Sequence, residues 1–344
     1  MTKEKSTVPR LRFPGFTDAW KQRKLGEVAI SFDYGLNSAA TEYDGENKYL
    51  RITDIDDDSR EFNISNLTSP EINLFGLDEY RLSIGDILFA RTGASVGKSY
   101  IYRSVDGKVY FAGFLIRVKI KDTFNPDFVF QNTLTSNYER FISITSMRSG
   151  QPGVNAQEYS NYEIMFPTLS EQEAIGSFFS DLDQLITLHQ RKLDDVKELK
   201  KALLQKMFPK GNGNDFPDLR FPEFTDAWKQ RKLGEVAEKF DNLRVPVTAS
   251  KRKPGDTPYY GANGIQDFVE GYTHDGEYIL IAEDGANDLK DYPVRYVNGK
   301  VWVNNHAHVI QALNNHANNL FLLIAIKSIN IEMYIVGGGR AKLN

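Results

Sequence analysis

The chain has 344 residues, of which 41% are hydrophobic and 26% charged, and its formal net charge is −4. This length allows one to three domains that each bury a core, and the composition is that of an ordinary soluble protein. The absence of cysteine excludes disulfides and thiolate metal sites and fits a reducing, cytoplasmic location. The acidic balance counts mildly against a stand-alone nucleic-acid-binding protein, unless a local basic patch or a basic partner supplies the contacts.

The most informative feature of the chain is a repeated segment near its start. PRLRFPGFTDAWKQRKLGEVA at residues 9–29 recurs at residues 217–237, with Arg10 replaced by Asp218 and Gly15 by Glu223. The offset of 208 residues is far longer than the roughly 20–50 residues of solenoid or propeller repeats. The sequences that follow the two copies are unlike each other. We therefore expect two tandem domains that enter their folds through the same segment and differ in what they recognise.

Short apolar runs rich in Ile, Val, Tyr and Phe follow each copy of the segment and are typical of β-strands. Residues 85–120 and 276–312 show the same rhythm, with Asp106-Gly107 and Asn298-Gly299 predicted as hairpin turns. RSGQPGVN at 148–155 aligns with GGGRAKLN at 337–344. The expected fold class is α+β, with two tandem domains built on mixed or antiparallel sheets.

A long helix is predicted between the two domains, over residues 170–210. Ser170 and Glu173 form a capping box, and Pro209 and Gly211 end the pattern. Apolar residues fall on a coiled-coil seam that is interrupted once by a four-residue stutter. The helix is too long for an ordinary globular helix, so we expect a spacer or a docking rod for a partner.

These features together resemble the DNA-specificity subunit of type I restriction-modification systems. The resemblance is carried by residues 11–29 and their second copy, by SEQEAIGSFFSDLDQLITLHQRKLDDVKELKKALLQKMFP, and by TPYYGANGI and GKVWVNNHAHVI in the second half. It implies two target-recognition domains, residues 1–169 and 211–344, each recognising one half of a bipartite double-stranded DNA target. Residues 170–210 would then be the conserved spacer helix that docks methyltransferase subunits, through Leu182, Leu185, Leu193 and Val196.

The resemblance also implies that this chain is not an enzyme and holds no cofactor. S-adenosylmethionine, ATP and magnesium are expected in the partner methyltransferase and restriction/translocase subunits. The family has a second long helix after the second domain, whereas this chain ends at Asn344, so the second domain is expected to be C-terminally truncated. The unpaired seam of the first helix is then expected to self-associate. The longest apolar run, residues 320–326, is too short for a membrane span, so no membrane contact is expected.

Glycine-flanked loops beside the predicted sheets provide the candidate DNA contacts, because such loops present side chains that bind base edges and phosphates. The candidates in the first domain are Thr92, Ser95, Lys98, Arg148 and Gln151. The candidates in the second domain are Tyr260, Asn263, Asn287, Arg340 and Lys342. Asparagines in YGANG and DGAND are also natural turn formers, so a purely structural role is the alternative for them.

Three other motifs are weighed and set aside. ARTGASVGKS has one residue too few for a phosphate loop and precedes a predicted strand. The NPDF sequence at 125–128 is explained as the cap of a helix. His306 and His308 could begin a metal site, but no acidic ligand is expected close to them. The acidic loop 55–59 is expected to face away from DNA.

A coiled-coil scaffold that binds only proteins remains the alternative function.

Overall fold

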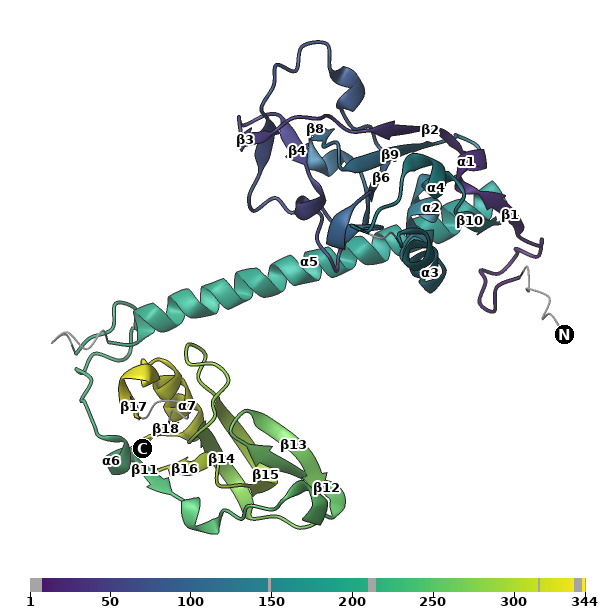
Figure 1. Ribbon diagram of the computed structural model, residues 1–344. Helices are drawn as coiled ribbons and strands as arrows, with labels where there is room; N and C mark the ends of the chain where they lie inside the picture. The colour runs from purple at the N-terminus through teal and green to yellow at the C-terminus, as the bar shows by residue number, and fades with distance from the viewer. Residues whose placement is uncertain (1–7, 148–149, 210–214, 315, 337–341, 344) are drawn as a thin grey trace. The chain divides into compact units, whose positions relative to one another are not determined.

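The computed structural model describes residues 8–147, 150–209, 215–314, 316–336 and 342–343. The chain divides into two compact units, Met1–Leu193 and Asp194–Asn344, and the long helix α5, Leu169–Met207, contributes to both (Figure 1). No helix in these described ranges is long and apolar enough to cross a membrane.

The remaining helices and strands of the first unit are β1 (Lys21–Lys24), α1 (Leu25–Val28), β2 (Ala29–Tyr34), β3 (Ala40–Glu42), β4 (Lys48–Leu50), β5 (Thr68–Pro70), β6 (Ile87–Ala90), β7 (Ser99–Ile101), β8 (Val109–Phe111), β9 (Leu115–Ile120), α2 (Pro126–Asn132), α3 (Ser136–Thr145), α4 (Ala156–Ser160) and β10 (Glu163–Phe166). Those of the second unit are α6 (Leu233–Val236), β11 (Ala237–Lys239), β12 (Pro254–Gly261), β13 (Gly264–Val269), β14 (His274–Ala282), β15 (Val294–Val303), β16 (Ala307–Ala312), α7 (Asn319–Lys327), β17 (Ile335–Val336) and β18 (Lys342–Leu343).

Both units contain the same arrangement of four antiparallel strands. The order is β2-β9-β6-β7 in the first unit and β11-β16-β14-β15 in the second, where β12 and β13 extend the sheet beyond β15. Strand β12 pairs in parallel with β15, which makes this sheet mixed. The predicted α+β fold and the predicted equivalence of residues 85–120 and 276–312 are therefore confirmed.

The central strand of each sheet is buried on both faces. In β6, Ile87 and Phe89 belong to one apolar cluster while Leu88 and Ala90 belong to another. In β14, Ile279 and Ile281 lie in one cluster and Tyr278 and Leu280 in a second. Because successive side chains of a strand point to opposite faces, these continuous apolar runs fill both sides of the sheet.

The two predicted hairpin turns differ from the structure. Asn298 and Gly299 lie inside β15, where Gly299 pairs with Gly276 of β14. Both glycines have positive φ, 88° and 141°. Glycine adopts such angles readily, and here they occur within paired strands instead of at a turn. Gly107 does follow a turn, but the next strand, β8, pairs in parallel with β4 instead of returning along β7.

The repeated segment makes one equivalent aromatic contact in the two units. Trp20 contacts Phe128 of α2, and Trp228 contacts Phe321 of α7, each with ring centroids 5.8 Å apart. Both helices begin with an asparagine cap, whose side chain accepts a hydrogen bond from the N–H of that phenylalanine. The identical sequence therefore meets an equivalent helix in each unit, and the predicted cap at 125–128 is confirmed.

Helix α5 contacts the first unit through a polar face. Ser180, Asp183 and Thr187 hydrogen-bond to Arg103, Gln131 and Glu61 of that unit. At the start of the helix, a Cβ on Gly176 would lie 2.5 Å from Asn125 Oδ1, so only glycine fits there. Since α5 begins at Leu169, Ser170 lies inside the helix, and its prediction as the cap is wrong.

The opposite, apolar side of α5 is exposed in the structure. Leu182, His189, Val196 and Leu203 recur at intervals of seven residues, which is the spacing of a coiled-coil seam. The predicted four-residue interruption, which brings Leu193 into the seam, stays a prediction. We call this surface the α5 stripe, and its large exposed members are Phe178, Phe179, Leu182, Leu185, Ile186, Leu193, Val196, Leu199 and Leu203.

Candidate nucleic-acid interface

The glycine-rich loop after β6 lies beside a second loop that carries a predicted site residue. The backbone of Thr92 pairs with Gly153, and the Gly93 N–H donates to the Pro152 carbonyl at 3.0 Å. Gln151 is exposed, and a Cβ on Gly93 would lie 3.2 Å from its Nε2. The structure thus brings Thr92 and Gln151 together, with Ser95 half-buried in the same loop. Arg148 lies outside the described residues.

Lys98 is placed differently from the prediction. Its side chain is buried, and Nζ donates to the Ile55 carbonyl at 2.9 Å and lies 2.6 Å from Asp57 Oδ1. An ammonium group that anchors the acidic loop 55–59 is not available to a phosphate. The structure therefore argues against Lys98 as a DNA contact, because its neighbours in space, which the sequence did not reveal, already satisfy it.

In the second unit, Asn263 connects two loops. Its Nδ2 donates to the Gly285 carbonyl, and its Oδ1 accepts from the Asn287 N–H, both at 2.9 Å. Arg295 also donates to the Asn263 carbonyl. Asn263 therefore orders the loop that presents the exposed Asn287, which supports the structural alternative for Asn263. Tyr260 is half-buried against an apolar cluster, and Arg340 lies outside the described residues.

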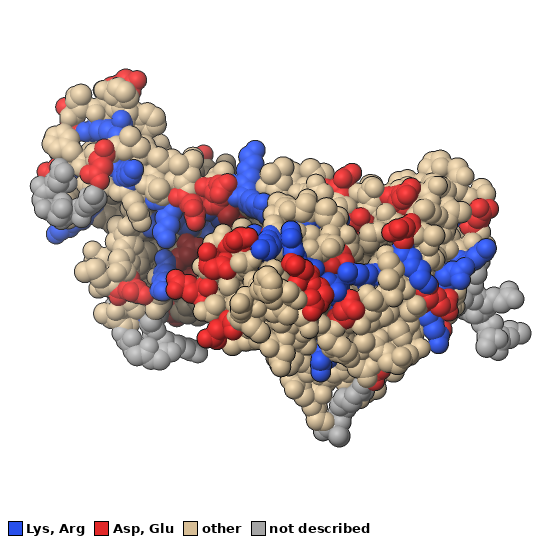
Figure 2. Space-filling view, turned by 90° about the horizontal axis from the view of Figure 1, so that it is seen from above, with Lys and Arg blue, Asp and Glu red and all other residues tan. Residues whose placement is uncertain are grey.

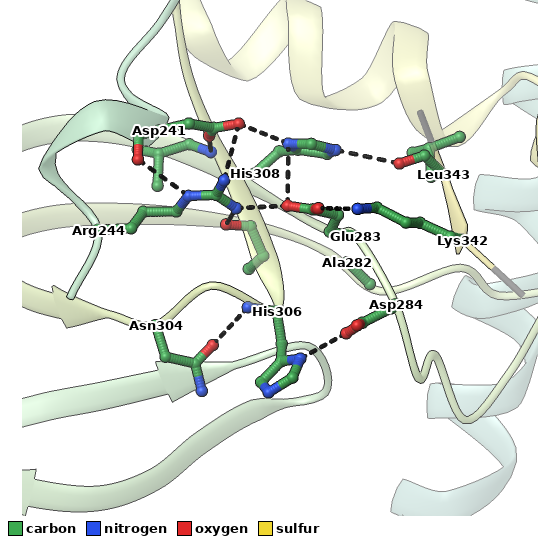
Figure 3. Close-up of polar contacts among 12 residues, drawn as sticks. Asp241, Arg244, Ala282, Glu283, Asp284, Asn304, His306, His308, Lys342 and Leu343 are labelled. Carbon is green, nitrogen blue, oxygen red and sulfur yellow. Dashed lines mark hydrogen bonds and ion pairs between the residues drawn. The ribbon is translucent and has the colours of Figure 1, made fainter. Parts of the chain in front are cut away.

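Lys342 belongs to an ionic network at the end of the second sheet (Figure 3). Glu283 accepts from Lys342 at 2.8 Å and from Arg244 at 2.6 Å. His308 Nδ1 lies 2.6 Å from Asp241 Oδ2, and its Nε2 lies 3.2 Å from the Leu343 carbonyl. The network fastens β18 to the sheet through side chains from three other segments.

The carboxyl groups of this network are held in their charged form. Burial alone would raise the pKa of Asp241, but hydrogen bonds from His308 and from the Val309 N–H outweigh it and hold this pKa well below its ordinary value. Burial would also raise the pKa of Glu283, but hydrogen bonds from Lys342 and Arg244 outweigh this effect and lower the pKa. Both groups therefore stabilise the second unit as anions.

Asp241, Glu283 and His308 offer ligand atoms within 4.8 Å of one another, close enough to surround a metal ion. The expectation that no acidic group lies near the histidines is wrong. However, Arg244 and Lys342 already neutralise these carboxylates, and a divalent cation would face their positive charges. The donor set fits a structural ion network better than a metal centre.

The backbone at the end of the central strand is the same in the two units. Arg91 donates its N–H to the Phe114 carbonyl and accepts from Val154, and Glu283 does the same with His306 and Leu343. The bridge between Thr92 and Gly153 is matched by the bridge between Asp284 and Lys342. These matches agree with the alignment of residues 148–155 with 337–344. We call this place the strand-end site. Its members are Arg91, Thr92, Phe114 and Gly153 in the first unit and Glu283, Asp284, His306 and Lys342 in the second.

The side chains at the strand-end site differ completely between the units. In the first unit, the Arg91 guanidinium lies over the Tyr34 ring at 5.0 Å, and the Phe114 side chain is 60% exposed. In the second unit, Asp284 and His306 form a half-buried pair, with Oδ1 and Nδ1 2.5 Å apart. One backbone arrangement thus presents an apolar ring in one unit and a polar ring in the other.

Sequence reasoning missed Phe114 and considered His306 only as a possible metal ligand. Their equivalence carries no local signal, because only the strand pairing brings them to the strand-end site. Lys251 and Lys253 could have been found from the basic run SKRK, and both are exposed beside Arg252, which lies 4.1 Å over the Tyr259 ring. On the face drawn in Figure 2, Lys and Arg side chains alternate with Asp and Glu instead of forming one basic patch.

Two units with one strand plan, a shared entry segment and different exposed side chains define a recognition protein with two domains on a long helix. A family model, the type I restriction modification DNA specificity domain, matches residues 17–198 and 225–344. The chain belongs to this family. The family predicted from the repeated segment is confirmed.

Individual relatives agree with this family. A Haemophilus influenzae protein named as a type I restriction enzyme specificity subunit is 48% identical over 116 residues, which cover 34% of this chain and 29% of that protein. The chain thus aligns with less than a third of that relative. The Methanocaldococcus jannaschii protein named as the MjaX specificity subunit is 25% identical over 93% of this chain and 78% of its own length.

A solved structure has the same fold. The S subunit of a type I restriction-modification system from M. genitalium matches with a TM-score of 0.66 and 15% identity, over 95% of this chain and 81% of that one. The likeness supports the arrangement of two tandem domains with a long helix between them.

Proposed function

We propose that this chain recognises a bipartite DNA sequence for a type I restriction-modification complex, each unit contacting one half of the target. The strand-end site is the observation that best supports this proposal. There, the same backbone hydrogen bonds hold different side chains in the two units. A common frame with exchanged side chains is what two independent base readers need, since bases are discriminated by the groups that meet their edges.

The recognition domains would comprise residues 1–169 and 211–344, with residues 170–210 as the spacer between them. In the first, Thr92, Ser95, Gln151 and Arg148 would face DNA; in the second, Asn287, Arg340 and Lys342 would do so. Exposed Lys251 and Lys253 add candidate phosphate contacts, because lysine binds phosphates without regard to sequence.

The α5 stripe supports a role in subunit docking. Leu182, Leu185, Leu193 and Val196 are between 38% and 54% exposed, and contiguous exposed apolar surface marks interaction sites. Helices of methyltransferase subunits would cover the stripe in the assembled complex. Without them, the same helix of a second copy would do so in a dimer. The complex would work in the cytoplasm, and the methyltransferase and restriction subunits would bind S-adenosylmethionine, ATP and magnesium.

A domain exchange tests the proposed function. Residues 30–165 are replaced by the counterpart from a relative with the same entry segment, and the complex with modification subunits selects duplexes from a random pool. We expect one half of the selected sequence to change and the other to persist. A chimera that changes both halves or neither contradicts independent readers.

The salt dependence of binding provides a second test of the same function. If lysine and arginine contact phosphates, the affinity of the complex for its selected duplex falls steeply as salt is raised from 50 to 200 mM, by roughly a thousandfold for about six contacts. Lys251→Ala with Lys253→Ala should flatten this slope without changing the selected bases. An unchanged slope would remove the basic loop from the interface.

A further inference from the structure

We propose that His306 contacts a base edge in the second half-site, accepting a hydrogen bond from the amino group of adenine or cytosine. Asp284 acts as the positioning residue of the ring. The inference rests on the proposed function and adds the residue and the chemical group that it recognises.

The geometry of the pair assigns the roles of the two ring nitrogens. Nδ1 lies 2.5 Å from Asp284 Oδ1, and an ionised carboxylate only accepts hydrogen bonds, so Nδ1 carries a proton. In the neutral ring, Nε2 then has a free lone pair. Among the described residues no partner contacts Nε2, and the side chain is 45% exposed. The ring is held by one nitrogen and offers the other to solvent.

Glu283 and Asp284 are adjacent in the chain but have different partners. Glu283 belongs to the ionic network, and Asp284 belongs to the pair with His306. Figure 3 shows Glu283 directed toward Arg244 and Lys342, while Asp284 is directed toward His306. The His306 N–H also donates to Asn304 Oδ1 at 2.8 Å, which fixes the turn before β16. The network therefore holds the backbone rigidly, and a ring on a rigid support distinguishes bases better than one on a loose loop.

A hydrogen-bond acceptor on the protein needs a donor on the base edge. In the major groove the only such donors are the amino groups at N6 of adenine and N4 of cytosine. A neutral histidine that offers Nε2 would therefore favour these two bases over guanine and thymine. At the equivalent position of the first unit, Phe114 offers an apolar ring, which suits the thymine methyl group. The two half-sites would differ at this position because the two rings differ.

The test is selection from a random duplex pool by the chain in complex with modification subunits. With His306→Ala we expect the preference at one position of one half-site to disappear, with about a 5- to 20-fold weaker affinity for the wild-type duplex. His306→Gln should change the preferred base at the same position. Phe114→Ala should affect the other half-site only. His316→Ala is the matched control, an exposed histidine beyond the other end of β16, and should change nothing.

The positioning role of Asp284 has its own readout. Asp284→Ala should relax the same base position as His306→Ala, and Asp284→Asn, whose amide oxygen still accepts the Nδ1 proton, should restore it. Two results overturn the inference while the proposed function stands. One is a base preference that His306→Ala leaves unchanged; the other is a wild-type preference for guanine or thymine at the position that His306→Ala relaxes. A wild-type complex that selects no sequence overturns both.

Discussion

Arg12 and Glu171 join the repeated segment to the start of α5. Arg12 Nε and Nη2 donate to the two carboxylate oxygens at 2.6 Å each, and the glutamate side chain is fully buried. The repeat places Arg220 at the equivalent position of the second copy. Its Nη1 is buried and has no hydrogen-bond partner among the described residues. The same arginine is therefore satisfied in one copy and incompletely satisfied in the other.

This asymmetry predicts different effects of the same substitution. Arg12→Ala leaves the buried Glu171 carboxylate without its partner, which is unfavourable, so the melting temperature of the first unit should fall by several degrees. Arg220→Ala is the matched control and should change stability much less. Hydrogen exchange at residues 20–34 and 228–242 separates the two units. Equal losses in both variants would contradict the role assigned to Glu171.

Lys98→Ala should act on a loop and leave base preference unchanged. The substitution removes the hydrogen bond to Ile55 and the contact with Asp57, at a cost of about 1–3 kcal/mol in unfolding free energy. Residues 55–58 should exchange amide hydrogen faster, while the duplexes selected by the complex stay the same. A change in the selected bases would return Lys98 to the DNA interface.

Leu185→Asp should abolish partner binding without unfolding the chain. Because Leu185 is 51% exposed, a charge there costs little in the isolated protein but several kcal/mol in a packed helix interface. We expect an unchanged melting temperature and loss of co-purification with modification subunits, and a smaller species in light scattering if the free chain dimerises. Lys201→Asp places the same charge on the polar side of α5 as the control. Normal co-purification of Leu185→Asp would show that the α5 stripe is not the interface.

Acid should destabilise the second unit through Asp241. The pKa of Asp241 in the folded state is lowered from its ordinary value of 3.8. Its stabilising contribution is therefore fully present well above pH 3.8 and is lost as the pH falls from 3.8 toward the lowered folded-state pKa. Asp241→Asn should lower the unfolding free energy at pH 7 by about 1–3 kcal/mol and make it less dependent on acid. Urea unfolding between pH 7 and pH 3 measures this, with exposed Asp275→Asn as the control. An Asp241→Asn curve parallel to wild type would exclude this linkage.

The sequence by itself determined the architecture of this protein. The repeated segment revealed two units on one plan, because an identical surface must meet an equivalent surface in each domain. Periodic apolar residues located α5, since a helix face repeats every 3.6 residues. Short apolar runs rich in Ile, Val, Tyr and Phe located the strands. The family followed from these same residues, and all of this information is local or repeated along the chain.

The tertiary structure alone decided which side chains are available at the candidate site. Lys98 looked like a phosphate contact until the fold placed the 55–59 loop against it, and Asn263 proved to order its neighbours. Phe114 and His306 became equivalent only because β9 and β16 pair at the same register with β6 and β14. Exposure and hydrogen bonding depend on residues far apart in sequence, which the packing of the sheet brings together.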